Sequence, residues 1–367
     1  MAIVINGSGT VTGLAVGGLP DGTVDAGTLA TNSVDSAELI DGAVDDSHIA
    51  SIKGRKNIII NGAMAVAQRG TSTTSGAQAY LLDRFYTFSF SATGRTVSQS
   101  TDSPAEFSHS LKVQRAANNT ATTDVYLSQP IESKNCVGTA GKKVTFSFWA
   151  KKGANWSRSS SIFPVSVTSG TGSDQSFMAG VTGGVTLINS SVTLTTSWAK
   201  YSFTSSAIVP TNSTQLIYQT ISGWAGTAGA DDSFYITGIQ LETGETATDF
   251  EHKSFGEELA LCQRYCYKTA TGVGNSLYGI GIAWTASSGH IVLQNSVPMR
   301  AAPSFTASGS FSILHNQSAI NVSVTMQKQT TDFARVDVSG SGFTVNGAFS
   351  LRNANDANAY LLLDAEL

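Results

Sequence analysis

The chain has 367 residues, of which 13% are charged and 36 are Gly, and its formal net charge is −4. Ordinary soluble proteins have about 25% charged residues, so this composition disfavours a helical bundle and favours short strands joined by tight turns. The negative net charge leaves no basic field to hold a phosphate backbone and disfavours nucleic acid as a partner. No apolar run approaches the roughly 20 residues that span a bilayer, which disfavours a membrane-spanning helix. The N-terminus also lacks the charged and apolar regions of a signal peptide, so we expect the chain to fold where it is made.

Residues 21–53 form a segment of their own. Seven acidic residues and no Lys or Arg precede Lys53. Apolar residues recur there at every fifth position, and the series begins slightly earlier: Leu14, Leu19, Val24, Leu29, Val34, Leu39, Val44 and Ile49. A period of five matches neither a helix nor a strand, so one chain alone cannot bury this stripe.

We therefore expect residues 21–53 to form a shaft in which three identical chains wind around one axis, with these eight side chains as the trimer core. The alternative of a single-chain pentapeptide solenoid has too few residues here for three coils. A disordered acidic linker is the remaining alternative.

The pentads DGTVDAGTLATNSVDSAELIDGAVDDSHIA, residues 21–50, resemble the repeats of bacteriophage tail fibres. Residues 1–20 resemble the N-terminal piece of the same proteins. The resemblance implies a homotrimer that residues 1–20 attach to a baseplate or other tail protein of the virion.

Residues 54–253 contain many short strand-like runs separated by Gly, Ser and Thr. In residues 144–149, alternation places Val144, Phe146 and Phe148 on one face. Residues 234–241 repeat the pattern, with Gly238 permitting a bulge between two apolar pairs. Many short strands over this length predict a β-sandwich of jelly-roll type.

The same region resembles a recurrent domain of phage tail fibres. The resemblance rests on INGAMAVAQRGTS (residues 60–72), SFWAKK (147–152) and above all IQLETGETATDFEHKSFGEELALCQRYCYK (239–268). It implies a jelly roll related to carbohydrate-binding modules. Many such modules hold calcium with an Asp in the last strand, where this chain has Thr237 and Gly238, so we assign no calcium site.

A capping box, Ser254 to Glu257, predicts a linking helix over residues 254–269. Phe255, Leu259, Cys262 and Cys266 would form its apolar stripe. Cys262 and Cys266 have no second ligand pair after them, so we expect packing there and no metal.

Residues 270–367 return to strand-like runs and predict a C-terminal β-sandwich head. Gly279 and Gly281 lie inside one run and indicate a bulge or a close backbone approach. Residues 316–331 and 353–358 are predicted to be polar loops suited to recognition.

No catalytic pattern stands out. Two pairs of carboxylates, Asp231 with Asp232 and Glu242 with Glu245, have the residue type that glycoside hydrolysis needs. Such residues on Gly-rich turns are more often solvated, and the five His residues are scattered. We expect no enzyme activity and no cofactor.

Sugar binding relies on aromatic faces beside hydrogen-bonding side chains. Trp224, Trp284 and Tyr278 lie in polar or Gly-rich settings and are our candidates for glycan contact. Burial in a core or interface is the competing interpretation for each.

Together these patterns predict an all-β tail fibre subunit with an intertwined trimeric N-terminal shaft, a jelly-roll β-sandwich, a short linking α-helix and a C-terminal β-sandwich head. We expect it to be made in the host cytoplasm, to reside in the virion and to bind a host cell-surface glycan or protein. The alternatives are a polysaccharide depolymerase and a structural decoration or collar fibre.

Overall fold

The computed structural model describes residues 4–5, 11–12, 56–74, 79–89, 94–176, 180–270 and 272–367. The chain divides into two compact units, Met1–Arg55 and Lys56–Leu367. In the first unit, β1 (Val4–Ile5) pairs antiparallel with β2 (Val11–Thr12). The eight apolar pentad residues lie outside the described residues, so the trimeric shaft stays a prediction. Within the described residues, no helix has the length and apolar character needed to cross a membrane.

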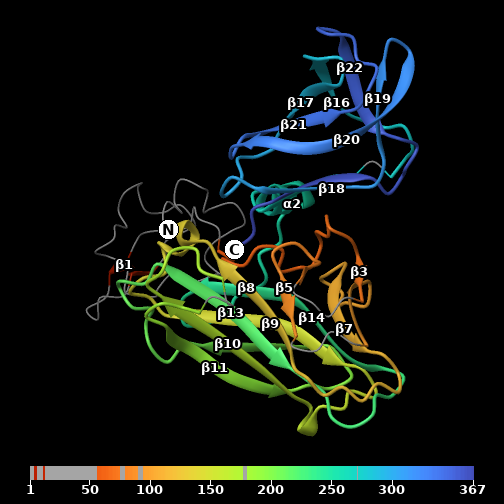
Figure 1. Cartoon of the computed structure of the whole chain (residues 1–367). Coiled ribbons are helices and arrows are strands. Elements are labelled where there is room, and N and C mark those ends of the chain that lie inside the picture. Colours follow the sequence, from red (N-terminus) through yellow and green to blue (C-terminus); the bar gives the residue numbers. More distant parts are fainter. Residues whose placement is uncertain are drawn as a thin grey trace. The chain divides into compact units, whose positions relative to one another are not determined.

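The second unit contains two six-stranded antiparallel sheets, which confirm the predicted all-β sandwich (Figure 1). The first sheet has the order β11-β10-β13-β8-β5-β4. Its strands are β11 (Val185–Thr193), β10 (Ile162–Gly170), β13 (Gln215–Ser222), β8 (Val125–Ile131), β5 (Tyr86–Phe88) and β4 (Ala79–Tyr80).

The second sheet has the order β12-β9-β14-β7-β6-β3. Its strands are β12 (Ala199–Thr204), β9 (Val144–Lys152), β14 (Asp232–Thr243), β7 (Ser110–Arg115), β6 (Arg95–Ser100) and β3 (Ser72–Thr73). Because consecutive strands often belong to different sheets, the pairing joins residues far apart in sequence.

The sandwich core confirms the predicted alternation. Phe146 and Phe148 are completely buried in a cluster that draws on both sheets. The predicted bulge in β14 also exists: the register with β9 shifts between Thr237 and Gln240, and Gly238 has φ +59°. A Cβ on Gly238 would lie 2.6 Å from the Phe107 ring, so this position requires glycine.

In the described part of the chain, three short helical segments accompany the sheets: α1 (Ser133–Cys136), the 3-10 turn η1 (Ser159–Ser161) and α2 (Phe255–Gln263). The capping box of α2 is present, with Ser254 accepting from the Glu257 amide. The helix is shorter than the one predicted over residues 254–269, because residues from Cys266 onward pair with a strand near the C-terminus. Phe255 is 61% exposed and lies outside the buried stripe.

The head contains a closed barrel, where a β-sandwich was predicted. Its strands, in barrel order, are β16 (Leu277–Ala283), β17 (Ser288–Gln294), β21 (Phe333–Ser339), β20 (Ser318–Gln329), β19 (Phe311–His315) and β22 (Ala348–Asn353). Alternation along a strand is the same in a sandwich and a barrel, and only the pairing of β16 with both β17 and β22 closes the ring.

In the head, the structure corrects the loop predicted over residues 316–331 and confirms the close backbone approach predicted at Gly281. Most of the loop predicted over 316–331 is strand β20, whose apolar residues alternate with polar ones. Gly281 does lie at a close backbone approach, since a Cβ there would meet the His290 carbonyl oxygen at 2.1 Å.

A separate three-stranded sheet, ordered β15-β23-β18, lies beside the barrel. Its strands are β15 (Cys266–Ala270), β23 (Tyr360–Asp364) and β18 (Ser304–Ser308). It connects α2 to the head, because β15 follows the helix directly.

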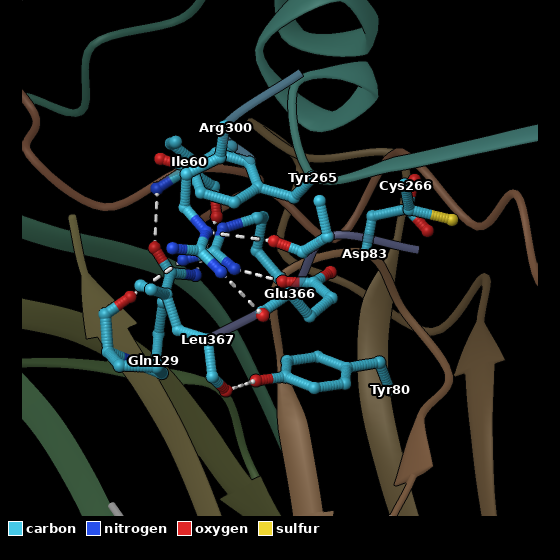
Figure 2. A network of polar contacts seen from close by, with 12 residues as sticks. Ile60, Tyr80, Asp83, Gln129, Tyr265, Cys266, Arg300, Glu366 and Leu367 are labelled. Atoms are coloured by element: carbon cyan, nitrogen blue, oxygen red, sulfur yellow. Dashed lines mark hydrogen bonds and ion pairs between the residues drawn. The ribbon is translucent and has the colours of Figure 1, made fainter. Parts of the chain in front are cut away.

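The end of the chain contacts the jelly roll through a buried polar network (Figure 2). Glu366 forms an ion pair with Arg84, whose guanidinium also donates to the Pro130 carbonyl oxygen at 2.7 Å. That guanidinium lies 3.6 Å from the centre of the Tyr265 ring. Tyr80 donates from its hydroxyl to the Leu367 carbonyl oxygen at 2.7 Å. These contacts tie the last residues of the head to strands of the first sheet.

Charge compensation holds this network together. Burial acts to lower the pKa of Arg84, but the carboxylate of Glu366 together with the hydroxyls of Tyr265 and Tyr80 outweighs burial and raises that pKa. Burial raises the pKa of Asp83 to about 6 and the pKa of Tyr265 to about 12.

Candidate functional site

An exposed tryptophan with a cation beside it lies on the outer face of the head barrel. Trp284 follows β16 directly and begins the turn into β17, where its backbone N–H donates to the Ser288 carbonyl oxygen at 3.0 Å. Its indole Nε1 donates to the Ser288 hydroxyl at 2.5 Å, which fixes the orientation of the ring. The residue is 36% exposed, while the other four tryptophans are buried or half-buried.

Two side chains from the neighbouring strands pack against this indole. The Arg335 guanidinium carbon lies 4.2 Å from the ring centre, and the His290 ring centre lies 4.7 Å away at 33° to the indole plane. Both come from strands that pair with each other, since Val292 is opposite Arg335 and His290 is opposite Asp337. The adjacent pairing of β16, β17 and β21 therefore assembles the group.

Asp337 holds the cation in place. Arg335 Nε donates to Asp337 Oδ1 at 2.9 Å, and Nη2 donates to Oδ2 at 3.3 Å. The side chains are 31% and 13% exposed, so the pair is reachable from solvent and still partly shielded. His290 Nδ1 is buried and has no hydrogen-bond partner in the described part of the chain. We call Trp284, Ser288, His290, Arg335 and Asp337 the Trp284 face.

Exposed apolar side chains continue this surface along the barrel. Ile280 and Ile282 of β16 are 72% and 56% exposed, and Val292 of β17 is 57% exposed. Aliphatic and aromatic surface beside a fixed arginine–carboxylate pair can hold a sugar, because a pyranose ring has an apolar face and a rim of hydroxyls. The geometry supports binding, with hydrogen bonds from the charged pair to those hydroxyls.

The other two sequence candidates lie elsewhere. Tyr278 belongs to the same strand as Ile280, but its ring packs on Phe311 inside the head and its hydroxyl donates to the Ala359 carbonyl oxygen at 2.6 Å. Trp224 is only 6% exposed in the jelly-roll core, with the guanidinium carbon of Arg115 6.0 Å from its ring. The structure brings neither residue to the Trp284 face.

Sequence reasoning missed His290, Arg335 and Asp337. Each alternates correctly with buried neighbours in its own strand, which indicated an outward position. Their proximity depends on β17 pairing with β21, which are about 40 residues apart in sequence, and no local pattern reports that pairing.

The carboxylates considered for catalysis are used in other contacts. Asp232 is fully buried and forms an ion pair with Arg115 at 2.7 Å, and it accepts from the Ser157 amide at 2.8 Å. Glu242 is buried and accepts from Thr248. Within the described residues, no group of three or more His, Cys, Asp or Glu side chains could hold a metal ion.

The jelly roll carries a second aromatic group beside a cation, in which Trp198 is half-buried and Tyr235 is buried. Trp198 and Tyr235 meet edge to face at 6.1 Å, and the Lys151 ammonium lies 4.8 Å from the Tyr235 ring centre. Asp102 accepts from Trp198 Nε1 at 3.0 Å and pairs with Lys151. Burial acts to raise the pKa of Asp102, but these two donors outweigh it and lower that pKa. This group is the rival contact surface.

Comparisons with known proteins find structural similarity alone. No family model and no curated protein matches the chain. Among solved structures, the enzymatically active domain of tailspike protein 4 of bacteriophage CBA120 matches 51% of this chain and 21% of its own, with 15% identity and a TM-score of 0.34.

A single carbohydrate-binding module and a tandem pair of such modules match with similar TM-scores. TmCBM61, solved in complex with β-1,4-galactotriose, matches 52% of this chain and all of its own, with 9% identity and a TM-score of 0.31. The tandem CBM22 domains of Paenibacillus barcinonensis Xyn10C match 85% of this chain and 97% of their own, with 10% identity and a TM-score of 0.30.

Proposed function

We propose that this chain is a subunit of a homotrimeric bacteriophage tail fibre that binds a glycan of the host surface through the Trp284 face. The observation that carries the proposal is the exposed indole of Trp284, held by Ser288 and flanked by Arg335 and His290. The pentad repeats and the closing block of the jelly roll, which resemble tail fibres, support the virion setting.

The mechanism is multivalent binding without bond cleavage. One aromatic platform with one charged pair gives a weak site, because an exposed site buries little surface. Three copies in one fibre, and several fibres on one particle, raise the effective affinity by orders of magnitude when the sites can engage together. Residues 1–20 attach the fibre to a baseplate or other tail protein in this proposal.

Binding of the full-length protein to immobilised surface polysaccharides from candidate host bacteria tests the proposal. Trp284→Ala should abolish binding, while Trp198→Ala, which removes the rival aromatic of the jelly roll, should leave it unchanged. The reverse pattern would place the contact on the jelly roll and overturn the role of the head.

The same samples separate binding from cleavage. A depolymerase would lower the viscosity of the polysaccharide and release reducing ends, whereas a fibre that only binds changes neither. If no polysaccharide or host cell binds the protein, the structural decoration or collar role replaces the proposed one.

A further inference from the structure

One side of the head barrel is apolar on its outer surface. The strands β19, β22, β16 and β17 are consecutive neighbours in the closed barrel and form this side. Their exposed apolar side chains are Leu314, Ala348, Ile280, Ile282 and Val292, which we call the apolar stripe. Three of the four strands, β16, β17 and β19, contain no Asp, Glu, Lys or Arg.

The pairing of the strands makes the apolar stripe continuous. Ser350 of β22 is opposite Leu314 of β19 on one edge and opposite Ile280 of β16 on the other. Ile282, two residues further along β16, is opposite Ala348. Directly opposite residues lie on the same face of a sheet, so these side chains share one outer surface.

The opposite side of the barrel carries the charges. Arg335 and Asp337 lie on β21, and Lys328 of β20 is opposite Arg335. Thr325 of β20 is exposed and opposite Asp337. The barrel is therefore amphipathic around its circumference. The indole of Trp284 lies at the border of the two sides, because it belongs to the turn between β16 and β17 and packs on Arg335.

A surface of this kind needs cover. The apolar stripe exposes about 400 Å² of aliphatic surface, within the range of the largest patches on monomeric proteins, which are often functional. Soluble surfaces usually intersperse charged side chains among apolar ones, and this side of the barrel lacks them. A pyranose ring has one small apolar face, so a bound sugar leaves most of the apolar stripe in water. Another protein surface covers the stripe better than a glycan does.

We propose that three copies of the head pack their apolar stripes against one another around the axis of the fibre. This inference rests on the proposed homotrimer and names the surface that joins its heads. Three stripes that meet at one axis remove about 1,200 Å² from water, which reaches the size of a stable specific interface. The polar side is excluded as this contact, because Lys328 and Arg335 of each copy would lose their hydration there.

The arrangement agrees with the pentad repeats and with the Trp284 face. Residues 21–53 also carry an apolar series that only other copies of the chain can cover, so one axis serves both parts. Trp284 borders the apolar stripe without belonging to it. The glycan site therefore lies at the rim of the interface, where solvent and a glycan reach it.

The test joins accessible cysteines in the full-length protein with a short bis-maleimide. Ile280→Cys places a thiol in the apolar stripe, and the matched control, Thr325→Cys, places one on the polar side of the same barrel. The native residues Cys136, Cys262 and Cys266 are buried and leave each variant with one accessible thiol. Covalent dimers should form at least tenfold faster in Ile280→Cys, at a rate that does not depend on protein concentration.

Light scattering on the same samples separates the possible failures. A mass of three chains with equal rates, or with faster joining in Thr325→Cys, would overturn the inference and leave the homotrimer standing. A mass of one chain with no covalent dimer would overturn both. A rate in Ile280→Cys that rises with concentration would assign the apolar stripe to contacts between fibres and would also overturn the inference.

A second pair of variants measures the energetic contribution of the apolar stripe. Ile280→Asp places three carboxylates near the axis and should lower the urea concentration at which the mass falls from three chains to one. Thr325→Asp adds the same charge on the polar side and should leave that midpoint unchanged. Equal midpoints for the two variants would overturn the inference.

Discussion

Glu366, the penultimate residue of the chain, is the counter-ion of Arg84, which is completely buried nearly 300 positions earlier. Arg84 belongs to the jelly roll and Glu366 follows the last strand of the head. The buried guanidinium of Arg84 needs this counter-ion, because an unpaired buried charge destabilises the folded state strongly.

Glu366→Gln should therefore lower the free energy of unfolding by about 3 kcal/mol, the magnitude found when one partner of a buried pair is removed. The control is Glu245→Gln, which breaks the pair with Lys143 where the Glu245 side chain is 69% exposed. That change should cost less than about 1 kcal/mol. Urea unfolding measures both, and equal losses would show that the buried pair contributes no more than the exposed one.

Asp83 gives stability an unusual pH dependence. Burial raises its pKa from 3.8 to about 6, so the folded state holds a proton that the unfolded state has lost between these values. The contribution of Asp83 to the free energy of unfolding is therefore fully present below about pH 4 and is lost as the pH rises to about 6. A shift of about two pKa units corresponds to roughly 3 kcal/mol.

Asp83→Asn should remove this decline between pH 4 and pH 6. Thermal or urea unfolding at half-unit pH steps, for both proteins, measures the difference. Parallel curves for the two proteins would contradict the raised pKa of Asp83.

Gly281 is required by close contact between strands of the barrel. Gly281→Ala places a Cβ 2.1 Å from the His290 carbonyl oxygen and 2.7 Å from the Phe349 ring, so β16 and β17 must separate. We expect a loss of about 2 to 3 kcal/mol, as in other overpacked sites. Gly256→Ala in the first turn of α2 meets no atom within 4 Å and should be neutral or slightly stabilising. Similar midpoints of urea unfolding for Gly281→Ala and Gly256→Ala would contradict the requirement for glycine at position 281.

The capping box should account for much of the stability of α2. Ser254→Ala removes the acceptor of the Glu257 amide and should cost about 1 kcal/mol. Thr246→Ala, at an exposed loop position nearby, should change stability by less than about 0.5 kcal/mol. Circular dichroism during urea unfolding measures the stability of both variants. If Ser254→Ala loses no more stability than Thr246→Ala, the cap contributes nothing.

Local patterns predicted most of the elements. The alternation in residues 144–149 and 234–241, the bulge at Gly238, the capping box at Ser254 and the close approach at Gly281 all follow from the side chain that each position can hold. The Trp284 candidate also came from the sequence, because Trp284 lies in a polar or Gly-rich setting.

The sequence by itself determined which faces of each strand are apolar, because alternation is a property of neighbouring residues. Only the tertiary structure decided how the strands pair. That pairing closed the head into a barrel, brought Arg335 and Asp337 to Trp284, and directed Glu366 to Arg84. It also paired β18 with β23, because hydrogen bonds between distant strands depend on the whole chain and leave no mark in a local pattern.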